Sequence, residues 1–123
     1  NMSSASAVYG TPDFASYSAS KFAVSALTEA LDIEWAAHDI RVCDIMPPFV
    51  KTAMVASQQA ASPFVEKMGV NLYPEDIAAV VLQQIEKPKT HRAVSFIFQV
   101  GWALAQVIPR SVLHRIFRIL AAK

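Results

Sequence analysis

Three side chains near the start of the chain have the types and spacing of a proton-transfer site. Tyr17 and Lys21 are four residues apart in an apolar-periodic stretch, and Ser4 lies thirteen residues before the tyrosine. Residues four apart on a helix share one face, so the ammonium group of Lys21 can approach the phenol of Tyr17. A nearby cation favours the phenolate form of a phenol, which can then give or take a proton near neutral pH. The hydroxyl of Ser4 can hydrogen-bond a substrate carbonyl and prepare it for hydride addition.

The surrounding residues make this pattern more specific than a lone Tyr-x-x-x-Lys pair, which often occurs by chance as a solvated surface pair. Asn1 and Ser3 precede Ser4, residues 17–24 surround the pair, and residues 41–52 follow it. In order and spacing, these segments resemble the short-chain dehydrogenase/reductase family from the end of its fifth strand onward. The resemblance covers about residues 1–100.

The resemblance implies a catalytic role for each member of the triplet. Ser4 would orient and polarise the substrate carbonyl, and Tyr17 would be the general acid/base. Lys21 would favour the ionised phenol and hydrogen-bond the nicotinamide ribose. The cofactor, NAD or NADP, would supply the hydride, while the protein supplies position and charge.

The resemblance also implies that the segment after the next strand binds the cofactor. The backbone of Val50 and the hydroxyl of Thr52 would hold the nicotinamide carboxamide. Pro47, together with Tyr17 and Lys21, would also belong to the cofactor-binding residues. The family usually has Pro-Gly here, whereas this chain has Pro47-Pro48. Proline fixes φ near −65° and lacks an N–H, so the turn must follow a more restricted path than glycine allows. The residues that distinguish NAD from NADP follow the second strand of such a fold, and the sequence contains none that match them.

The expected fold class is α/β, the C-terminal half of a Rossmann-type doubly wound parallel sheet with a C-terminal amphipathic helix. The family's glycine-rich phosphate loop is not found among these 123 residues, whose three glycines are Gly10, Gly69 and Gly101. We therefore expect residues 1–100 to form the catalytic half of the domain and residues 101–123 a basic extension. The 123-residue chain alone is expected to be inactive.

Hydrophobic periodicity predicts the elements that position the triplet. Apolar residues at three- and four-residue spacing predict a core helix over 16–37, and Pro74 followed by two acids predicts a helix over 74–87. Short apolar runs predict parallel strands over 40–46 and 93–100. The stripe of the second helix that is expected to be buried comprises Ile77, Ala78, Val81, Leu82 and Ile85. Residues 53–73 are either an apolar lid over the substrate or short helices packed on the core.

The remaining reactive side chains favour structural roles. Asp44 interrupts the apolar strand 40–46, where a carboxylate must be hydrogen-bonded, and we favour a structural role over a substrate contact. The single Cys43 excludes an internal disulfide and is consistent with a reducing compartment, so a cytoplasmic location is expected. The three histidines lack metal-ligand spacing, and no metal is expected.

The charge distribution singles out the C-terminal region. Residues 1–86 hold ten acidic and four basic residues, and residues 87–123 hold seven basic residues and no acid. Residues 110–123 predict a basic amphipathic helix whose apolar side carries Val112, Leu113, Ile116, Phe117 and Leu120. This helix can lie on a membrane surface or cover the substrate cleft or a partner subunit. A transmembrane helix over 93–108 is the minority view, and no nucleic-acid motif is present.

The sequence as a whole therefore predicts an NAD(P)-dependent oxidoreductase that transfers hydride reversibly between an alcohol and a carbonyl, on an apolar substrate. An extended-type nucleotide-sugar epimerase or dehydratase is a rival, although only 106 residues follow Tyr17 and that branch needs a large C-terminal domain. A non-catalytic nucleotide-binding or membrane-associated relative is the second rival. The resemblance implies a small-molecule substrate and a homo-oligomer formed through the helix 17–37 as the partners.

Overall fold

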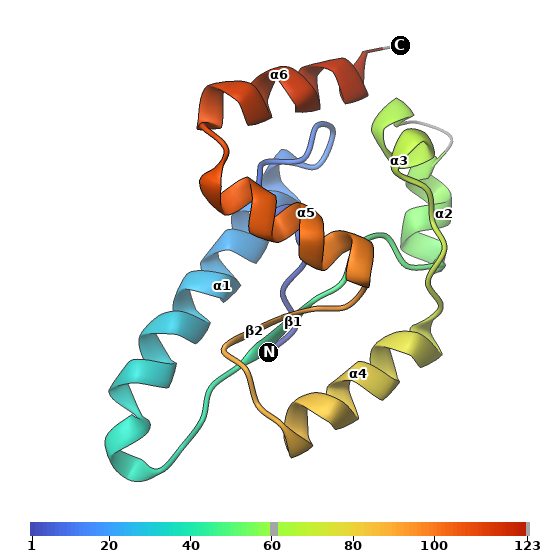
Figure 1. The fold of residues 1–123 in the computed structure, drawn as a ribbon. Coiled ribbons are helices and arrows are strands. Elements are labelled where there is room, and N and C mark those ends of the chain that lie inside the picture. Colours follow the sequence, from blue (N-terminus) through green and yellow to red (C-terminus); the bar gives the residue numbers. More distant parts are fainter. Residues whose placement is uncertain (60–61, 123) are drawn as a thin grey trace.

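The computed structural model describes residues 1–59 and 62–122, which form short strands surrounded by helices (Figure 1). In chain order the elements are η1 (Ala5–Ala7), α1 (Ala15–Glu34), η2 (Ala36–His38), β1 (Asp44–Met46), α2 (Ala53–Gln59), α3 (Pro63–Met68), α4 (Pro74–Glu86), β2 (His91–Ala93), α5 (Phe96–Val107) and α6 (Arg110–Ala121). In Figure 1, α1 and α4 lie on opposite sides of the strands.

In the described residues the sheet consists of two parallel strands, and a third parallel segment joins it through a single bridge. β1 pairs with β2 in a register that joins Asp44 to His91 and Met46 to Ala93. On the other side of β1, Met2 forms a parallel bridge to Ile45. Parallel neighbours need long crossover connections, which are supplied here by α1 and α4. The predicted α/β class is confirmed, and the strand expected over 40–46 is present but shorter.

The predicted helix over 16–37 is confirmed as α1, which continues into η2 and ends where Asp39 takes a left-handed conformation with φ of 57°. Its expected role as a core helix is not confirmed. Its buried residues are Ser18 and Thr28, whereas Leu27 is 54% exposed and Ile33 is 79% exposed. α1 therefore packs on the parallel segments through hydroxyl side chains, and much of its apolar surface stays uncovered in this chain.

The strand expected over 93–100 is wrong. β2 ends at Ala93, and α5 begins three residues later. Ser95 is the N-cap of α5, because its side chain accepts a hydrogen bond from the N–H of Phe98 at 3.1 Å. An apolar run of this length fits a buried strand or a buried helix equally well, and the cap residue decides between them. Residue 100, the expected domain boundary, lies within α5.

The helix expected over 74–87 is confirmed as α4, which starts at Pro74 with the Asp76 carboxylate accepting the Tyr73 N–H at 2.8 Å. Its expected buried stripe is only partly buried. Ile77 is covered, but Leu82 is 63% exposed. The other members of the stripe, Ala78, Val81, Leu82 and Ile85, are all exposed. The second buried residue is Gln84, whose amide donates to the Asp44 carbonyl at 3.2 Å, so a polar contact fastens α4 to β1.

Candidate active site

A cavity of ≈ 600 Å³ lies where the predicted catalytic and cofactor segments meet. Its lining comes from five stretches of the chain, residues 4–17, 47–55, 64–72, 95–105 and 113–120. The predicted site residues on its wall are Ser4, Tyr17, Pro47, Val50 and Thr52. The fold thus brings together residues that are up to 48 positions apart in the sequence.

Ser4 is held at the turn between the first parallel segment and η1. It is the N-cap of η1, and its Oγ accepts a hydrogen bond from the Ser6 N–H at 3.1 Å. A hydroxyl that accepts one bond can still donate its own hydrogen, so Ser4 can donate to a group in the cavity. The next residue, Ala5, donates its N–H to the Pro47 carbonyl at 2.9 Å. This bond fixes Ser4 beside the predicted cofactor segment.

Tyr17 lies in the first turn of α1, which the preceding loop aligns. The Thr11 N–H donates to Ser18 Oγ at 3.0 Å, and the Ser18 N–H donates to the Phe14 carbonyl at 2.7 Å. The ring of Phe14 meets the ring of Tyr17 edge-on, with centroids 6.3 Å apart. These contacts hold the half-buried phenol on the cavity wall.

Lys21 lies one turn further along α1 and is not part of the cavity wall. Its ammonium nitrogen is 5.4 Å from the centre of the Tyr17 ring, a cation–π distance. The same nitrogen donates to the Met2 carbonyl at 3.0 Å, which ties α1 to the first parallel segment. The predicted pairing of Lys21 with Tyr17 is therefore present as a contact between charge and ring.

The predicted cofactor segment runs along the cavity in an extended path. The Lys51 N–H donates to the Leu72 carbonyl at 2.8 Å, next to a parallel bridge between Val50 and Leu72. Thr52 Oγ1 accepts the Val55 N–H at 3.4 Å at the start of α2. The Thr52 hydroxyl keeps its hydrogen for donation, so this segment offers a hydrogen-bond donor on the cavity wall.

Aromatic rings form a continuous part of the cavity wall. Phe14 lies 6.0 Å from Phe49, Phe49 lies 6.2 Å from Phe64, and Phe64 stacks on Phe117 at 5.4 Å between ring centroids. These four rings come from the loop before α1, the segment after β1, α3 and α6. The sequence does not predict this wall, because its members are scattered over more than 100 residues.

The apolar side of α6 covers the cavity. Leu113 is buried, and Phe117 and Leu120 line the cavity beside it. The amphipathic pattern of residues 110–123 left a membrane surface, the cleft and a partner subunit open as uses, and the cleft accounts for these three side chains. The short helices α2 and α3 also border the cavity, and α3 packs against α6. The described part of residues 53–73 thus contains short helices, and the function of this stretch as a lid over the substrate stays a prediction.

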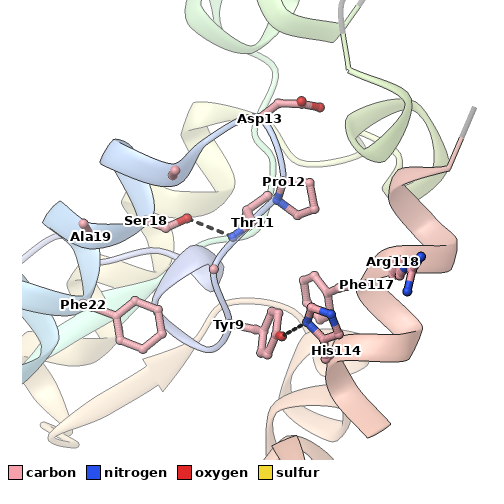
Figure 2. A pocket seen from close by; sticks show the side chains of 12 residues that line it. Tyr9, Thr11, Pro12, Asp13, Ser18, Ala19, Phe22, His114, Phe117 and Arg118 are labelled. Carbon is pink, nitrogen blue, oxygen red and sulfur yellow. Dashed lines mark hydrogen bonds between the residues drawn. The ribbon is translucent and has the colours of Figure 1, made fainter. Parts of the chain in front are cut away.

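The same helix separates this cavity from a second, more open one of ≈ 820 Å³. Figure 2 shows His114 and Phe117 of α6 turned toward Tyr9, whose hydroxyl is 2.9 Å from His114 Nδ1. The rings of Tyr9 and Phe117 are 4.5 Å apart, and Phe117 lines both cavities. Tyr9 thereby fixes α6 to the loop before α1. The second cavity contains no predicted site residue.

Asp32 connects the far end of α1 to the strand region. Its carboxylate accepts hydrogen bonds from the Arg41 side chain at 3.0 Å, from the Val42 N–H at 3.0 Å and from the Thr90 hydroxyl at 2.9 Å. The bond from Arg41, followed by those from Val42 and Thr90, lowers the pKa of Asp32 from 3.8 to about 2. This network sets the direction of the helix that carries Tyr17.

The lowered pKa of Asp32 predicts a pH-dependent contribution to stability. The unfolded chain binds the proton at higher pH than the folded chain does, so the contribution is complete above pH 3.8 and is lost as the pH falls to about 2. Asp32→Asn should make the free energy of unfolding fall less steeply across this window, as measured by urea denaturation. Asp39→Asn is the control, because the Asp39 carboxylate makes no hydrogen bond within residues 1–59 and 62–122. Equal slopes for Asp32→Asn and the unmodified protein would contradict the prediction.

Asp44 is placed away from the cavity. Its side chain is fully buried, and Oδ1 lies 3.0 Å from His91 Nδ1. The other ring nitrogen of His91 lies 3.0 Å from the exposed Glu29 carboxylate, so His91 bridges two acids. Asp44 Oδ2 has no hydrogen-bond partner in the part of the chain that the structure describes. This arrangement agrees with a structural role for Asp44.

Comparison with known proteins gives consistent matches to one family. A family model described as short chain dehydrogenase matches residues 1–63. The Short-chain dehydrogenase anuF of Penicillium roqueforti is 32% identical over 85% of this chain and 38% of its own length. The 3alpha-hydroxysteroid dehydrogenase of Mediterraneibacter gnavus is 38% identical over 67% of this chain and 34% of its own length.

A solved structure matches almost the whole chain. The crystal structure of a short chain dehydrogenase from Burkholderia cenocepacia J2315 in complex with NADP superposes with a TM-score of 0.75. It is 25% identical in sequence, and the match covers 95% of this chain and 46% of that protein. The chain thus spans less than half the length of each of these relatives.

Proposed function

Because the chain belongs to the short chain dehydrogenase family, we propose that the complete protein is an NAD(P)-dependent oxidoreductase. In this proposal it transfers hydride reversibly between an alcohol and a carbonyl group of an apolar small molecule. The observation that carries the proposal is that Ser4, Tyr17, Val50 and Thr52 all line the cavity of ≈ 600 Å³. Two hydroxyls on one wall can hold one carbonyl oxygen.

The proposed roles follow from where each group lies. Ser4 donates a hydrogen bond to the carbonyl oxygen and orients it. Tyr17 gives the proton to that oxygen during reduction and takes it back during oxidation. Lys21, with its charge 5.4 Å from the Tyr17 ring centre, stabilises the phenolate that remains after proton transfer. All three are fixed by backbone or packing contacts, so little reorganisation is needed at the moment of reaction.

The cofactor segment fits the nicotinamide end of NAD or NADP in one respect. Thr52 has a hydroxyl hydrogen to donate, and Val50 lies next to it on the same wall. Pro48 offers no N–H, so the donors must come from the residues after the two prolines. The cofactor supplies the hydride when bound. The NADP in the Burkholderia relative supports this assignment, and the residues here do not favour NADP over NAD.

The aromatic wall supports an apolar substrate. Phe49, Phe64 and Phe117 line the same cavity as the two hydroxyls, and their rings cannot hydrogen-bond a sugar or a charged group. Binding sites for small molecules are usually apolar cavities with a few placed polar groups that fix orientation. The hydroxysteroid named for the Mediterraneibacter relative is a substrate of that character. An extended-type enzyme acting on nucleotide sugars fits this wall less well.

We also propose a homo-oligomer formed through the helix 17–37. Leu27 and Ile33 leave apolar surface of α1 exposed, and exposed apolar patches commonly mark protein contacts. Sedimentation velocity of the complete protein tests this assignment. A monomer at micromolar concentration would contradict it.

The substrate class is tested by the complete protein with a panel of apolar and polar carbonyl compounds, followed at the absorbance of reduced nicotinamide. Phe117→Ala should raise KM for the best apolar ketone on the order of tenfold, because burial of an aromatic ring is worth about 1.5–3 kcal/mol. Its effect on a small polar carbonyl should be slight. The control is Phe96→Ala, since Phe96 is 77% exposed and lies outside the cavity.

The outcomes separate the proposals. Unchanged KM for both ketones in Phe117→Ala would contradict the assignment of the aromatic wall to the substrate. No oxidation of NADH or NADPH with any carbonyl compound would favour the non-catalytic relative instead. Thermal denaturation of both variants shows whether α6 remains packed.

A further inference from the structure

The outer face of α5 is apolar and exposed along its whole length. Phe96, Val100, Leu104 and Val107 follow one another at spacings of four, four and three, so they share one face. They are 77%, 46%, 51% and 77% exposed. The opposite face, which includes Trp102, lines the cavity. A helix that is apolar on both sides requires an apolar environment on the side that the protein does not cover.

α6 adds a second exposed apolar stripe. Val112, Ile116 and Ile119 are 43%, 41% and 71% exposed, and they lie apart from the side chains that cover the cavity. Arg115 is three residues after Val112 and four before Ile119, so it borders this stripe directly. Arg118 follows Arg115 by three residues, so the two arginines are neighbours on the helix surface. An arginine beside an apolar stripe can lay its aliphatic stem on apolar material and keep its charge in water.

The charge of this region identifies the kind of partner. Residues 87–123 contain seven basic residues and no acid. Across residues 1–59 and 62–122, no carboxylate forms an ion pair with Arg115 or Arg118. The exposed apolar side chains therefore fit an apolar part of a partner. The arginines at the border, which form no ion pair in the described residues, fit negative charges at the edge of that apolar part.

We propose that the outer face of α5 and the exposed stripe of α6 form a lipid-binding surface that lies on an anionic membrane. Helices of this kind lie in the plane of the interface, with their apolar side chains between the acyl chains and their arginines at the headgroups. At 12 residues α5 is about 18 Å long, which is well short of the ~30 Å hydrocarbon core.

None of the helices in residues 1–59 and 62–122 is long and apolar enough to cross a membrane.

A second copy of the chain fits this surface less well than lipid does. In a two-fold contact the same patch of both copies comes together, so the basic residues of the two patches are brought close to one another. Like charges brought together in this way repel one another, and no acid in residues 87–123 can compensate them. Anionic headgroups remove that repulsion.

The surface also adjoins the mouth of the cavity. Ile97 lines the cavity and is 85% exposed, so it lies at the rim between the cavity and the outer face of α5. An apolar molecule dissolved in the membrane would therefore reach the rim without crossing water. The lipid-binding surface itself does not depend on the proposed enzymatic function.

The test uses the complete protein and co-sedimentation with vesicles of phosphatidylcholine alone or with about 30 mol% phosphatidylglycerol, because each arginine near an anionic surface contributes about 1 kcal/mol. Binding should be strong only with phosphatidylglycerol and should fall as salt is raised. Phe96→Ser/Leu104→Ser should lower the partition coefficient on the order of tenfold or more. Arg115→Gln/Arg118→Gln should lower it by a similar factor and weaken its salt dependence.

The matched control is Leu82→Ser/Ile85→Ser on α4, which removes equally exposed apolar side chains, 63% and 73% accessible, from another surface. This control should bind vesicles as the unmodified protein does. The proposal is overturned if the unmodified protein does not sediment with phosphatidylglycerol vesicles, or if both double variants bind as tightly as the control. It is also overturned if Phe96→Ser/Leu104→Ser changes the oligomeric state and leaves vesicle binding unchanged, because the face then belongs to a second copy.

Discussion

Tyr17→Phe will lower kcat of the complete protein by about 10²–10⁴-fold, the usual contribution of a positioned general acid/base. The substitution removes one oxygen atom and keeps the ring, so the edge-on contact with Phe14 and the cation–π contact with Lys21 both remain. The fold and the cavity should therefore be preserved. Steady-state kinetics with the best carbonyl substrate, together with circular dichroism, measures both properties.

The chain contains a matched control for this substitution. Tyr73 also has a lysine over its ring, since the Lys51 nitrogen is 4.2 Å from the ring centre and 2.8 Å from the hydroxyl. This pair is geometrically closer than that of Tyr17 and Lys21, but Tyr73 lies outside the cavity. Tyr73→Phe should leave kcat nearly unchanged. If the two variants have similar kcat, the phenol of Tyr17 has no special role in proton transfer.

His91→Ala will lower the free energy of unfolding by about 3–5 kcal/mol, because it leaves a fully buried carboxylate without its partner. Asp44 Oδ1 would lose its contact with the His91 ring, and Oδ2 already has no hydrogen-bond partner in the described residues. The edge-on contact between His91 and Trp102 of α5 would be lost as well. Urea denaturation of the complete protein measures the change.

Two further variants show whether the buried charge is the cause. Glu29→Gln removes only the exposed acid, 61% accessible at its side chain, and should cost no more than about 1 kcal/mol. Asp44→Asn combined with His91→Ala should recover part of the loss, because a neutral amide is easier to bury than a carboxylate. A cost for His91→Ala as small as that for Glu29→Gln would show that Asp44 does not depend on the histidine.

The spacing of Tyr17 and Lys21 was sufficient to predict that they meet, because four residues on a helix place two side chains on one face whatever the tertiary structure is. The helix itself followed from apolar periodicity, and the start of α4 followed from Pro74 and the acids after it. These are local effects that depend on neighbouring residues only. The position of Ser4 at the end of a parallel segment also followed from the sequence, since such ends lie at the edge of the sheet where site residues gather.

The local sequence pattern predicted the wrong element where one segment can form either a strand or a helix. The run 93–100 is apolar enough for a strand, and the hydrogen bond from Phe98 N–H to Ser95 fixed it as the start of a helix. The stripe of α4 failed for a different reason, since periodicity shows which residues share a face but not whether another element covers that face.

Only the tertiary structure decided how the cavity is walled and what remains outside it. Phe14, Phe49, Phe64 and Phe117 are separated by up to 103 positions, and no local rule relates them. The sequence predicted an amphipathic helix over 110–123 from the spacing of its own residues, and α6 extends over Arg110–Ala121. Packing of α6 against α3 and Tyr9 then decided that the apolar side of α6 faces the cavity. The tertiary structure also left the outer face of α5 exposed. Contacts between distant segments depend on the whole fold, which spacing along the chain does not specify.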